Sequence, residues 1–502
     1  MDKRKRSLKN MIYAVFSEFI ILAFGLLLPR LWIVNYGSEV NGLLSSLNQF
    51  LVYLGLFEAG VGAATLQALY KPVSEDNWDG INGVLSATNH YYKHTSRYYF
   101  IGLVLLAAVY PLIAKSTLPY HTIFGAVFFS GFGNVVLFYF QGKFNFFLQA
   151  EGKNYIITNL NTIVSILTSL SKVLLISLNV DIVLILMASF VIQCMQACYI
   201  MWYMRRYKKL NLKVEPNLES ISQKNSILVH QVSGLIFNNT DVLILTAVCN
   251  LKIVSVYALF KMISSQVESL LRIPLNSIRF ILGQTFHADR KLFIKRIDLV
   301  ESYNSALQYA LFSVTLFLYL PFIRLYTEGV TDINYVDPLL AILFVTISLL
   351  DRSRAPMLMT IEFAGHFRNT IRQTIVEATI NLVVSLVGVH FLGIYGVLLG
   401  TVVALGWRSI DIICYTNRRI LERSPFRTLS VYLLNLGLFL LTQLLLRNLF
   451  DASAITSYLR FALVGAASSV LSLCIFVLGQ TLVFSRNRAF VLQLLRRVFP
   501  HM

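Results

Sequence analysis

Long apolar runs recur along almost the whole chain of 502 residues, and no other feature constrains its fold as strongly. A helix of about 20 apolar residues crosses the roughly 30 Å hydrocarbon core of a bilayer. The chain is 56% hydrophobic and only 14% charged, whereas soluble domains are about 25% charged. We therefore predict an all-α, polytopic membrane protein with about 14 transmembrane helices.

The predicted spans follow one another through short connections. They cover roughly 11–34, 40–66, 98–115, 120–141, 155–178, 181–204, 226–248, 253–273, 303–326, 338–361, 371–392, 395–416, 428–447 and 457–484. The first run is too long for a signal peptide and contains Glu18 and Arg30, so we interpret it as a membrane helix and not as a cleaved segment.

Basic residues are distributed very unevenly between the two sets of loops. Most of the 43 Lys and Arg lie in the loops on the side of the two termini, whereas the opposite loops hold only Lys115, Lys252 and Arg447. By the positive-inside rule, this asymmetry places both termini in the cytoplasm. It also explains the net charge of +18 without a nucleic-acid partner.

The chain shows an internal repeat of low residue identity. A Lys-Asn pair precedes two spans and a short outer turn at Lys9 and again at Lys224. We predict two six-helix lobes in parallel repeat around a central cavity, an architecture of carriers that work by alternating access. The predicted domains are the lobes 1–210 and 226–425, the cytoplasmic basic linker 211–225, helices 13 and 14 at 426–484, and an amphipathic cytoplasmic tail at 485–502.

Polar and ionisable residues within the predicted spans are concentrated in a few helices. Such residues usually face a bundle interior or a wet cavity. The candidate substrate or cavity residues are Arg30, Asn238, Asn239, Asp241, Lys261, Glu268 and Arg272, and the candidate coupling or gate residues are Glu18 and Glu58. The spacing of Lys261, Glu268 and Arg272 places them on one helical face. They form either a structural ion pair against a neighbouring helix or a cavity wall with cationic positions for an anionic group.

Glu58 is the one charge in the apolar run 43–66. Asn41, Asn48, Gly55 and Gly62 recur every seven residues in the same span, with Ser45 alongside, and such a stripe lets one membrane helix pack closely on others. Glu58 borders this stripe and therefore points into protein. Two roles stay open for it: a structural partner near the inner gate, or a group whose protonation couples to opening.

The sequence contains no signature of an enzyme or of a metal centre. The five cysteines lie in or at the end of apolar runs and form no CxxC pair, which favours neither disulfides nor a metal site. A phosphate-binding loop and the common hydrolase motifs are absent from it. We therefore predict a protein without catalytic activity or cofactor, with proton or sodium coupling left open.

Two stretches resemble a known family. These are "PRLWIVNYGSEVNGLLSSLNQFLVYLGLFEAGVGAATLQALYKP" (29–72) and "SGLIFNNTDVLILTAVCNLKIVSVYALFKMI" (233–263). They resemble the polysaccharide transporter family, the Wzx-type flippases of lipid-linked oligosaccharides. That family belongs to the exporter superfamily that also holds drug/cation antiporters and the lipid II flippase.

The resemblance implies a function in surface polysaccharide biosynthesis at the bacterial inner membrane. The substrate would be an undecaprenyl-pyrophosphate-linked repeat unit of O-antigen, capsule or exopolysaccharide, moved from the cytoplasmic to the outer leaflet. Cationic cavity residues would hold the pyrophosphate, and the two extra helices would form a groove for the lipid tail. Implied partners are membrane lipids, a polysaccharide polymerase and the chain-length machinery.

Two other functions compete with this one. The candidate cavity residues carry mixed charge, which leaves both the pyrophosphate site and a coupling ion open. An antiporter of small cationic or amphipathic compounds is the first alternative. A membrane enzyme such as a polymerase or glycosyltransferase is the second, although the short outer loops argue against it.

Overall fold

The computed structural model describes residues 22–489 apart from 59–60, 208 and 218–239. Every secondary-structure element in these ranges is helical. Ten of the described helices are long and apolar enough to cross a membrane. The prediction of an all-α, polytopic membrane protein is therefore confirmed.

The other predicted spans have individual reasons for not meeting the same length and hydropathy limits. The described part of the first span is the shorter apolar helix Leu22–Tyr36. Most of the span 226–248 lies outside the described residues. The eighth span lies in the charged helix α10 (Leu251–Ala288), and the tenth is divided between α12 (Pro338–Ser353) and α13 (Ala355–Phe363).

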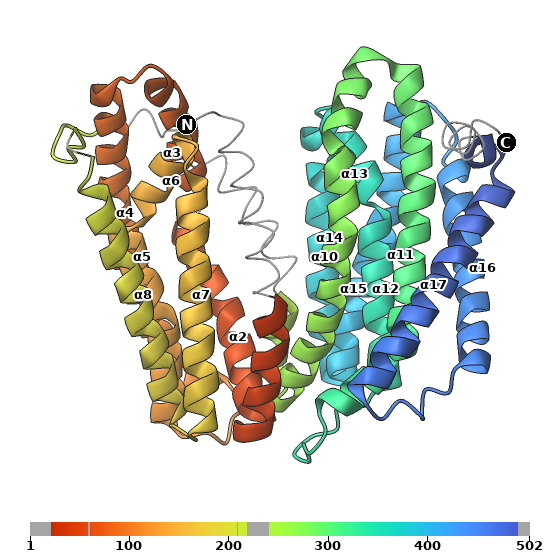
Figure 1. The fold of residues 1–502 in the computed structure, drawn as a ribbon, viewed down its shortest axis with the longest axis horizontal. Helices are drawn as coiled ribbons and strands as arrows, with labels where there is room; N and C mark the ends of the chain where they lie inside the picture. The colour runs from red at the N-terminus through yellow and green to blue at the C-terminus, as the bar shows by residue number, and fades with distance from the viewer. Residues whose placement is uncertain (1–21, 59–60, 208, 218–239, 490–502) are drawn as a thin grey trace. The chain divides into compact units, whose positions relative to one another are not determined.

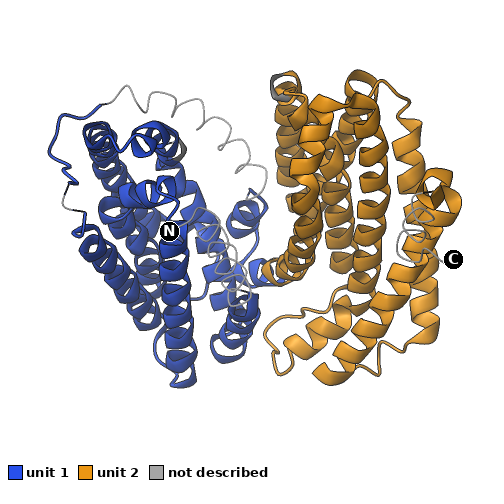
Figure 2. Ribbon diagram, turned by 45° about the horizontal axis from the view of Figure 1, so that its top comes forward, with its two compact units in different colours: residues 1–256 blue, residues 257–502 orange. Residues whose placement is uncertain are grey.

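The chain forms two compact units, residues 1–256 and 257–502, coloured separately in Figure 2. Helix α10 begins in unit 1 and continues into unit 2. The predicted lobes 1–210 and 226–425 remain predictions about the repeat, as do the linker, the last two helices and the tail.

Unit 1 is a bundle of antiparallel helices, labelled in Figure 1. After Leu22–Tyr36 its elements are α2 (Ser38–Leu54), the short 3-10 helix η1 (Gly55–Phe57), α3 (Val61–Ser74), α4 (Trp78–Ile113), α5 (Tyr120–Phe140), α6 (Gly142–Ala150), α7 (Asn154–Ser177) and α8 (Ile182–Met204). Helix α5 packs between α4 and α8, and α3 packs against α4 and α6. Leu43, Tyr99 and Ile185 are fully buried in the main core cluster.

Unit 2 contains most of α10, which has 38 residues, and the 37-residue helix α11. After α10 its elements are α11 (Arg290–Tyr326), α12, α13, α14 (Phe367–Leu392), α15 (Ile394–Tyr415), the π-helical turn η3 (Thr416–Ile420), α16 (Phe426–Leu449) and α17 (Tyr458–Val483). Helices α14 and α15 form a tight hairpin, because a Cβ on Gly396 would lie 2.1 Å from the Gly388 carbonyl oxygen. Small residues permit this approach of two membrane helices. Helix α17 packs along α11.

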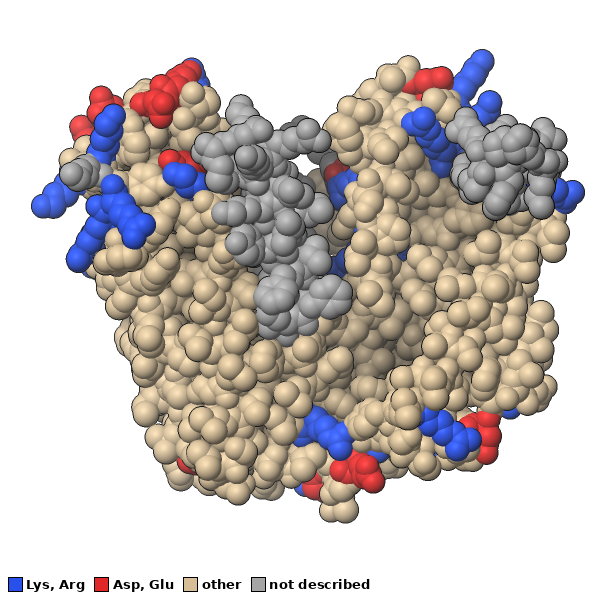
Figure 3. Space-filling view, viewed as in Figure 1, with Lys and Arg blue, Asp and Glu red and all other residues tan. Residues whose placement is uncertain are grey.

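The surface has the character expected of helices in lipid. On the face shown in Figure 3, charged side chains gather mainly at the ends of the helices of each unit, and the surface between is largely uncharged. Large apolar side chains face outward in both units; Leu112 is 76% exposed and Phe391 is 81% exposed. Such exposure is unfavourable in water and favourable in hydrocarbon.

The predicted continuous span 40–66 is wrong at Glu58. Helix α2 ends at Leu54, η1 follows, and Glu58 closes a turn in which its N–H bonds the Gly55 carbonyl. A Cβ on Gly55 would meet no atom within 4 Å, so this glycine marks the break and not a helix contact. The close approach occurs instead at Gly42, where a Cβ would lie 1.7 Å from the Leu251 carbonyl oxygen.

The predicted loop before span 3 is also wrong, because α4 begins 20 residues earlier than the predicted start at 98. Asn77 accepts a hydrogen bond from the Gly80 backbone N–H at 3.0 Å and so caps this helix. The polar residues of 78–97 had suggested a loop. They form the extension of a membrane helix beyond its apolar part.

Candidate functional site

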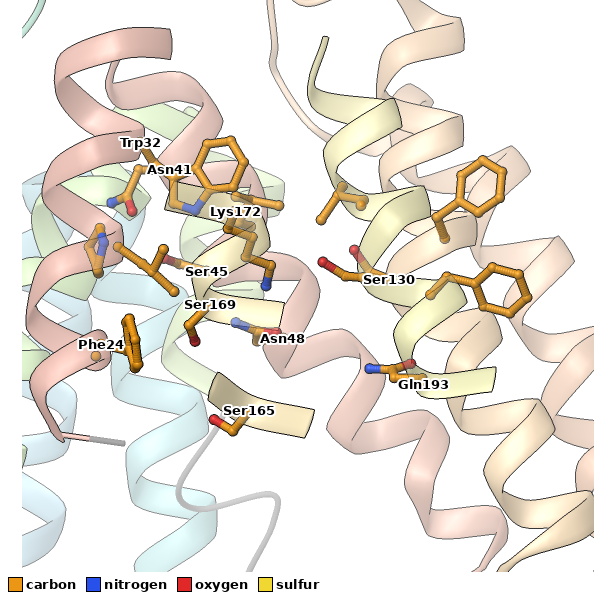
Figure 4. A pocket seen from close by; sticks show the side chains of 18 residues that line it. Phe24, Trp32, Asn41, Ser45, Asn48, Ser130, Ser165, Ser169, Lys172 and Gln193 are labelled. Atoms are coloured by element: carbon orange, nitrogen blue, oxygen red, sulfur yellow. The ribbon is translucent and has the colours of Figure 1, made fainter. Parts of the chain in front are cut away.

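Unit 1 encloses a cavity of about 420 Å³ within its helical bundle (Figure 4). The helix Leu22–Tyr36 and helices α2, α5, α7 and α8 contribute its walls. Its polar lining consists of hydroxyl and amide side chains and one ammonium group, that of Lys172. Phe24, Trp32, Phe129 and Phe190 provide aromatic surface beside them.

The polar groups reach the cavity because of their spacing along three helices. Helix α7 presents Ser165, Ser169 and Lys172, which are four and three residues apart and therefore share one face. The same spacing occurs in α2, which presents Asn41, Ser45 and Asn48, and α8 adds Ser189 and Gln193. The serines are small, so the faces that carry them leave open space inside the bundle.

A glycine in α5 makes room for the Gln193 amide. A Cβ on Gly133 would lie 1.4 Å from the Gln193 side-chain oxygen, a distance that no real contact allows. Gly133 therefore fixes where the Gln193 side chain runs. In Figure 4 the Gln193 side chain lies across the cavity from Ser165 and Ser169.

Hydrogen bonds to residues 246 and 255 hold the α2 wall in place. The Asn41 amide donates to the Ser255 hydroxyl at 2.7 Å, and the Ser46 and Thr246 hydroxyls are 2.7 Å apart. Asn41 and Ser46 are buried, and the backbone contact at Gly42 lies between them. These groups position α2, so that Ser45 and Asn48 face the cavity together with Asn41.

Lys172 determines the electrostatics of the cavity. No Asp or Glu lines it among the described residues. Within the described part of the chain, Lys172 has no hydrogen bond or ion pair, and Figure 4 shows its ammonium directed toward Asn48. An ammonium away from bulk water is stabilised by an anion with further hydrogen-bond donors around it. The site is therefore suited to a ligand that combines negative charge with hydroxyl groups.

A metal centre is not formed by the described residues. They contain no group of three or more His, Cys, Asp or Glu side chains that could hold a metal ion. The five cysteines are free thiols.

Among the described residues, none of the predicted site residues of unit 1 lines this cavity. Pro29 lines it, but the neighbouring Arg30 does not. Asp241 is 7% exposed and lies in a helical segment beside Thr240, whose hydroxyl is 3.2 Å from that of Tyr53. The predicted residues Glu18, Asn238 and Asn239 lie outside the described residues.

Glu58 has a specific partner in α4. Its carboxylate accepts a hydrogen bond of 2.5 Å from the Tyr92 hydroxyl. Tyr92 is 1% exposed, so Glu58 is anchored at the break between α2 and α3. The contact gives Glu58 a structural partner and leaves its predicted gating role as a proposal.

The predicted site residues of unit 2 all lie on α10. Lys261 lies over the Tyr257 ring at 5.6 Å. Glu268 accepts a hydrogen bond from the Ser348 hydroxyl at 2.8 Å, and the Arg272 guanidinium lies 3.9 Å from the same carboxylate. Glu268 and Arg272 thus form only a loose contact along the helix. The Arg272 side chain is 57% exposed, so it is accessible to a ligand.

Sequence reasoning missed Lys172, which had no partner that the sequence could name. A signal was present, since Thr158, Thr162, Ser165, Ser169 and Lys172 recur at helical spacing along one span. A polar face that ends in a lone cation is unusual in a membrane helix. It indicates an internal polar cavity even before the neighbouring helices are known.

The fold has clear counterparts among solved structures, although no family model and no curated protein sequence matches the chain. An inward-facing multidrug resistance MATE family transporter of the MOP superfamily aligns with a TM-score of 0.62 and 16% identity, covering 82% of this chain and 99% of its own. The lipid II flippase MurJ, in an inward closed conformation, aligns with a TM-score of 0.64 and 12% identity, covering 93% and 98%.

A further match is a mutant of the Vibrio cholerae MATE transporter VcmN. Its TM-score is 0.51 at 14% identity, and it covers 84% of this chain and 98% of its own. At such identities the likeness concerns the fold. The chain therefore has the fold that MATE transporters and the MurJ flippase share.

Proposed function

We propose that the chain is a transporter that moves an undecaprenyl-pyrophosphate-linked oligosaccharide from the cytoplasmic to the outer leaflet by alternating access. The observation that carries the proposal is the lining of the unit 1 cavity: one ammonium, many hydroxyl and amide groups, and no carboxylate among the described residues. This lining supports an anionic, hydroxyl-rich head group over a cationic drug.

The chemistry of such a substrate matches the groups in the cavity. A pyrophosphate needs fixed positive charge in a partly dry site, and Lys172 can supply it. Sugar hydroxyls both donate and accept, as do the amides of Asn48 and Gln193. The proposed cavity residues Arg30, Asp241, Lys261, Glu268 and Arg272 of the sequence prediction remain candidates for other stages of transport.

The extent of the structural matches also supports a flippase. MurJ covers 93% of this chain, whereas the two MATE transporters cover 82% and 84%. This chain is therefore matched more fully by the flippase.

The inner-membrane location, the cytoplasmic termini and a polymerase partner belong to the same proposal.

The experiment compares the source bacterium with and without the gene. Deletion should make undecaprenyl-linked repeat units accumulate on the cytoplasmic face, measured by the accessibility of their sugars to an added lectin in oriented vesicles. The wild-type gene and Lys172→Arg should restore exposure on the outer face. Lys172→Met should reduce it at least about tenfold, because a neutral side chain cannot hold the pyrophosphate. Lys71→Met, an exposed position on α3, is the matched control.

Two results would overturn the proposal. Repeat units that reach the outer leaflet at the normal rate in the deletion strain would exclude flipping by this chain. Raised drug tolerance on overexpression, with unchanged surface polysaccharide, would instead identify the antiporter.

A further inference from the structure

Unit 1 has a second cavity, a groove of about 550 Å³ between α7 and α8. Its α7 lining runs from Tyr155 to Leu167 and its α8 lining from Ile192 to Tyr203. At 1.5 Å per residue, these stretches are about 18 Å and about 17 Å long. The groove uses the opposite face of α7 from Ser165 and Ser169, so it is separate from the cationic cavity.

The groove is apolar along most of its length and open to the surroundings of the helices. Ile163 is 54% exposed, Leu167 is 46% exposed and Met195 is 62% exposed. Asn159 lies one turn from the end that Tyr155 marks. Such a lining suits a flexible hydrocarbon chain, and the unbranched Met195 side chain can adapt to its shape.

One end of the groove carries aromatic rings and positive charge. The Arg206 guanidinium lies 4.6 Å from the centroid of the Trp202 ring and 5.5 Å from that of Tyr203, which lines the groove. Trp and Tyr side chains concentrate at the level of lipid head groups. Arg206 is exposed and therefore stands where a lipid phosphate would lie, beside the mouth of the groove.

The dimensions of the groove match one leaflet. Half of the roughly 30 Å hydrocarbon core is about 15 Å, and the groove is about 18 Å long from its aromatic end. We propose that the groove binds one acyl chain of an anionic phospholipid from the leaflet at the α8 C-terminus, with the lipid phosphate at Arg206. Asn159 then lies at the level of the ester groups, where its amide can donate to an ester carbonyl.

A phospholipid is the occupant that these observations favour over a polyprenyl tail. The lining ends at Leu167 and Ile192, within about one leaflet depth of the aromatic end. A polyprenyl chain is far longer than this and would leave most of its length outside. The proposal does not depend on the transported substrate.

The test uses the purified full chain in nanodiscs that contain phosphatidylglycerol with a photoreactive acyl chain. Crosslinks located by peptide mass spectrometry should fall on the groove faces of α7 and α8. Arg206→Gln should lower crosslinking about fivefold, the effect of one basic side chain at a lipid surface. The matched control Lys213→Gln removes an exposed cation that does not line the groove and should change little.

A bulky residue tests the apolar part separately. Met195→Trp should fill the groove and remove the crosslinks, whereas Leu184→Trp, on the exposed surface of α8 outside the groove, should keep them. Equal crosslinking by phosphatidylcholine and phosphatidylglycerol probes would overturn the role of Arg206. Crosslinks outside α7 and α8, or loss of the phosphatidylglycerol crosslinks on addition of undecaprenyl phosphate, would overturn the phospholipid site.

Discussion

In unit 2, the buried arginines Arg354 and Arg408 both contact Glu377, whereas in unit 1 Lys172 faces a cavity without a carboxylate in its described lining. The unit 2 distances are 2.5 Å for Arg354 and 3.4 Å for Arg408. Asp351 accepts from Arg354 at 2.7 Å, and Asp411 pairs with Arg408. The ion pairs connect α12, α14 and α15 within the bundle.

The difference separates structural charge from charge that is available to a ligand. Arg354, Glu377 and Arg408 are 8%, 5% and 3% exposed, and both arginines pair with Glu377. Removing one member of a buried ion pair leaves its partner uncompensated and strongly destabilises a protein. Lys172 is not part of such a pair among the described residues, so its positive charge can act on a substrate.

The largest expected effect is that of Glu377→Gln. The substitution removes the charge that Arg354 and Arg408 share and should lower the stability of unit 2 by about 3–5 kcal/mol. Thermal unfolding of the purified chain in detergent measures it, with the fraction of monodisperse protein as the signal. Glu362→Gln is the matched control, because its ion pair with Arg279 is largely exposed and is worth little. Equal midpoints for the two variants would contradict a structural role for the buried network.

Lys143 in unit 1 offers a pH-dependent test of how a buried charge without a carboxylate partner affects stability. It lies in α6, outside the ten spans, and its ammonium donates to the Asn89 amide oxygen at 2.7 Å and the Tyr139 carbonyl at 3.2 Å. Burial, followed by the nearby Lys93 charge, lowers the pKa of Lys143 from 10.5 to about 8. Among the described residues, no carboxylate pairs with it.

The sign of the pH effect follows from proton binding. Between about pH 8 and pH 10.5 the unfolded chain keeps a proton that Lys143 loses in the folded state, so stability rises with pH. The rise should reach at most about 3 kcal/mol and should be absent in Lys143→Met. Unfolding in denaturant at pH values across this range measures it. If stability depends on pH in the same way in the wild type and in Lys143→Met, burial of the charged Lys143 ammonium does not destabilise the folded chain.

Much of the fold could be predicted because each membrane span depends on a short, continuous stretch of the sequence. Each apolar run identifies its own helix, and the loops between runs carry the charge pattern. The stripe of Asn41, Ser45 and Asn48 was also visible, but it predicted only helix packing. The structure gives it two functions: Asn41 donates a hydrogen bond to Ser255, and all three side chains line the cavity.

The candidate site was harder to predict because it depends on which helices come together. The sequence gives the polar face that ends at Lys172, but not that the faces of α2 and α8 meet it. The ion pairs of Glu377 likewise join residues 23 and 31 positions away in sequence, on other helices. The break at Glu58 was missed for a local reason, since an apolar run predicts a continuous helix and does not show where the backbone changes to the 3-10 turn η1.

Lys172→Met should not lower stability, in contrast to Glu377→Gln. It removes an ammonium that has no carboxylate partner among the described residues, so stability should be unchanged or rise by about 1 kcal/mol. Transport should fall nevertheless, as the proposed function requires. The same thermal assay and the lectin assay measure the two effects on one preparation. A fall in stability like that of Glu377→Gln would instead show that Lys172 has a structural role.

Arg272→Ala should produce the smallest change in stability. Its side chain is 57% exposed and lies 3.9 Å from Glu268, and exposed pairs of this kind contribute less than about 0.5 kcal/mol. Transport should still fall if Arg272 contacts the pyrophosphate, and Arg272→Lys should restore part of it because the charge is retained. Ser269→Ala, one turn closer to Lys261 on the same helix, is the control for a change in helix surface. Normal flux in Arg272→Ala would leave Lys172 as the cation on which the proposed site depends and would return Arg272 to the pair with Glu268.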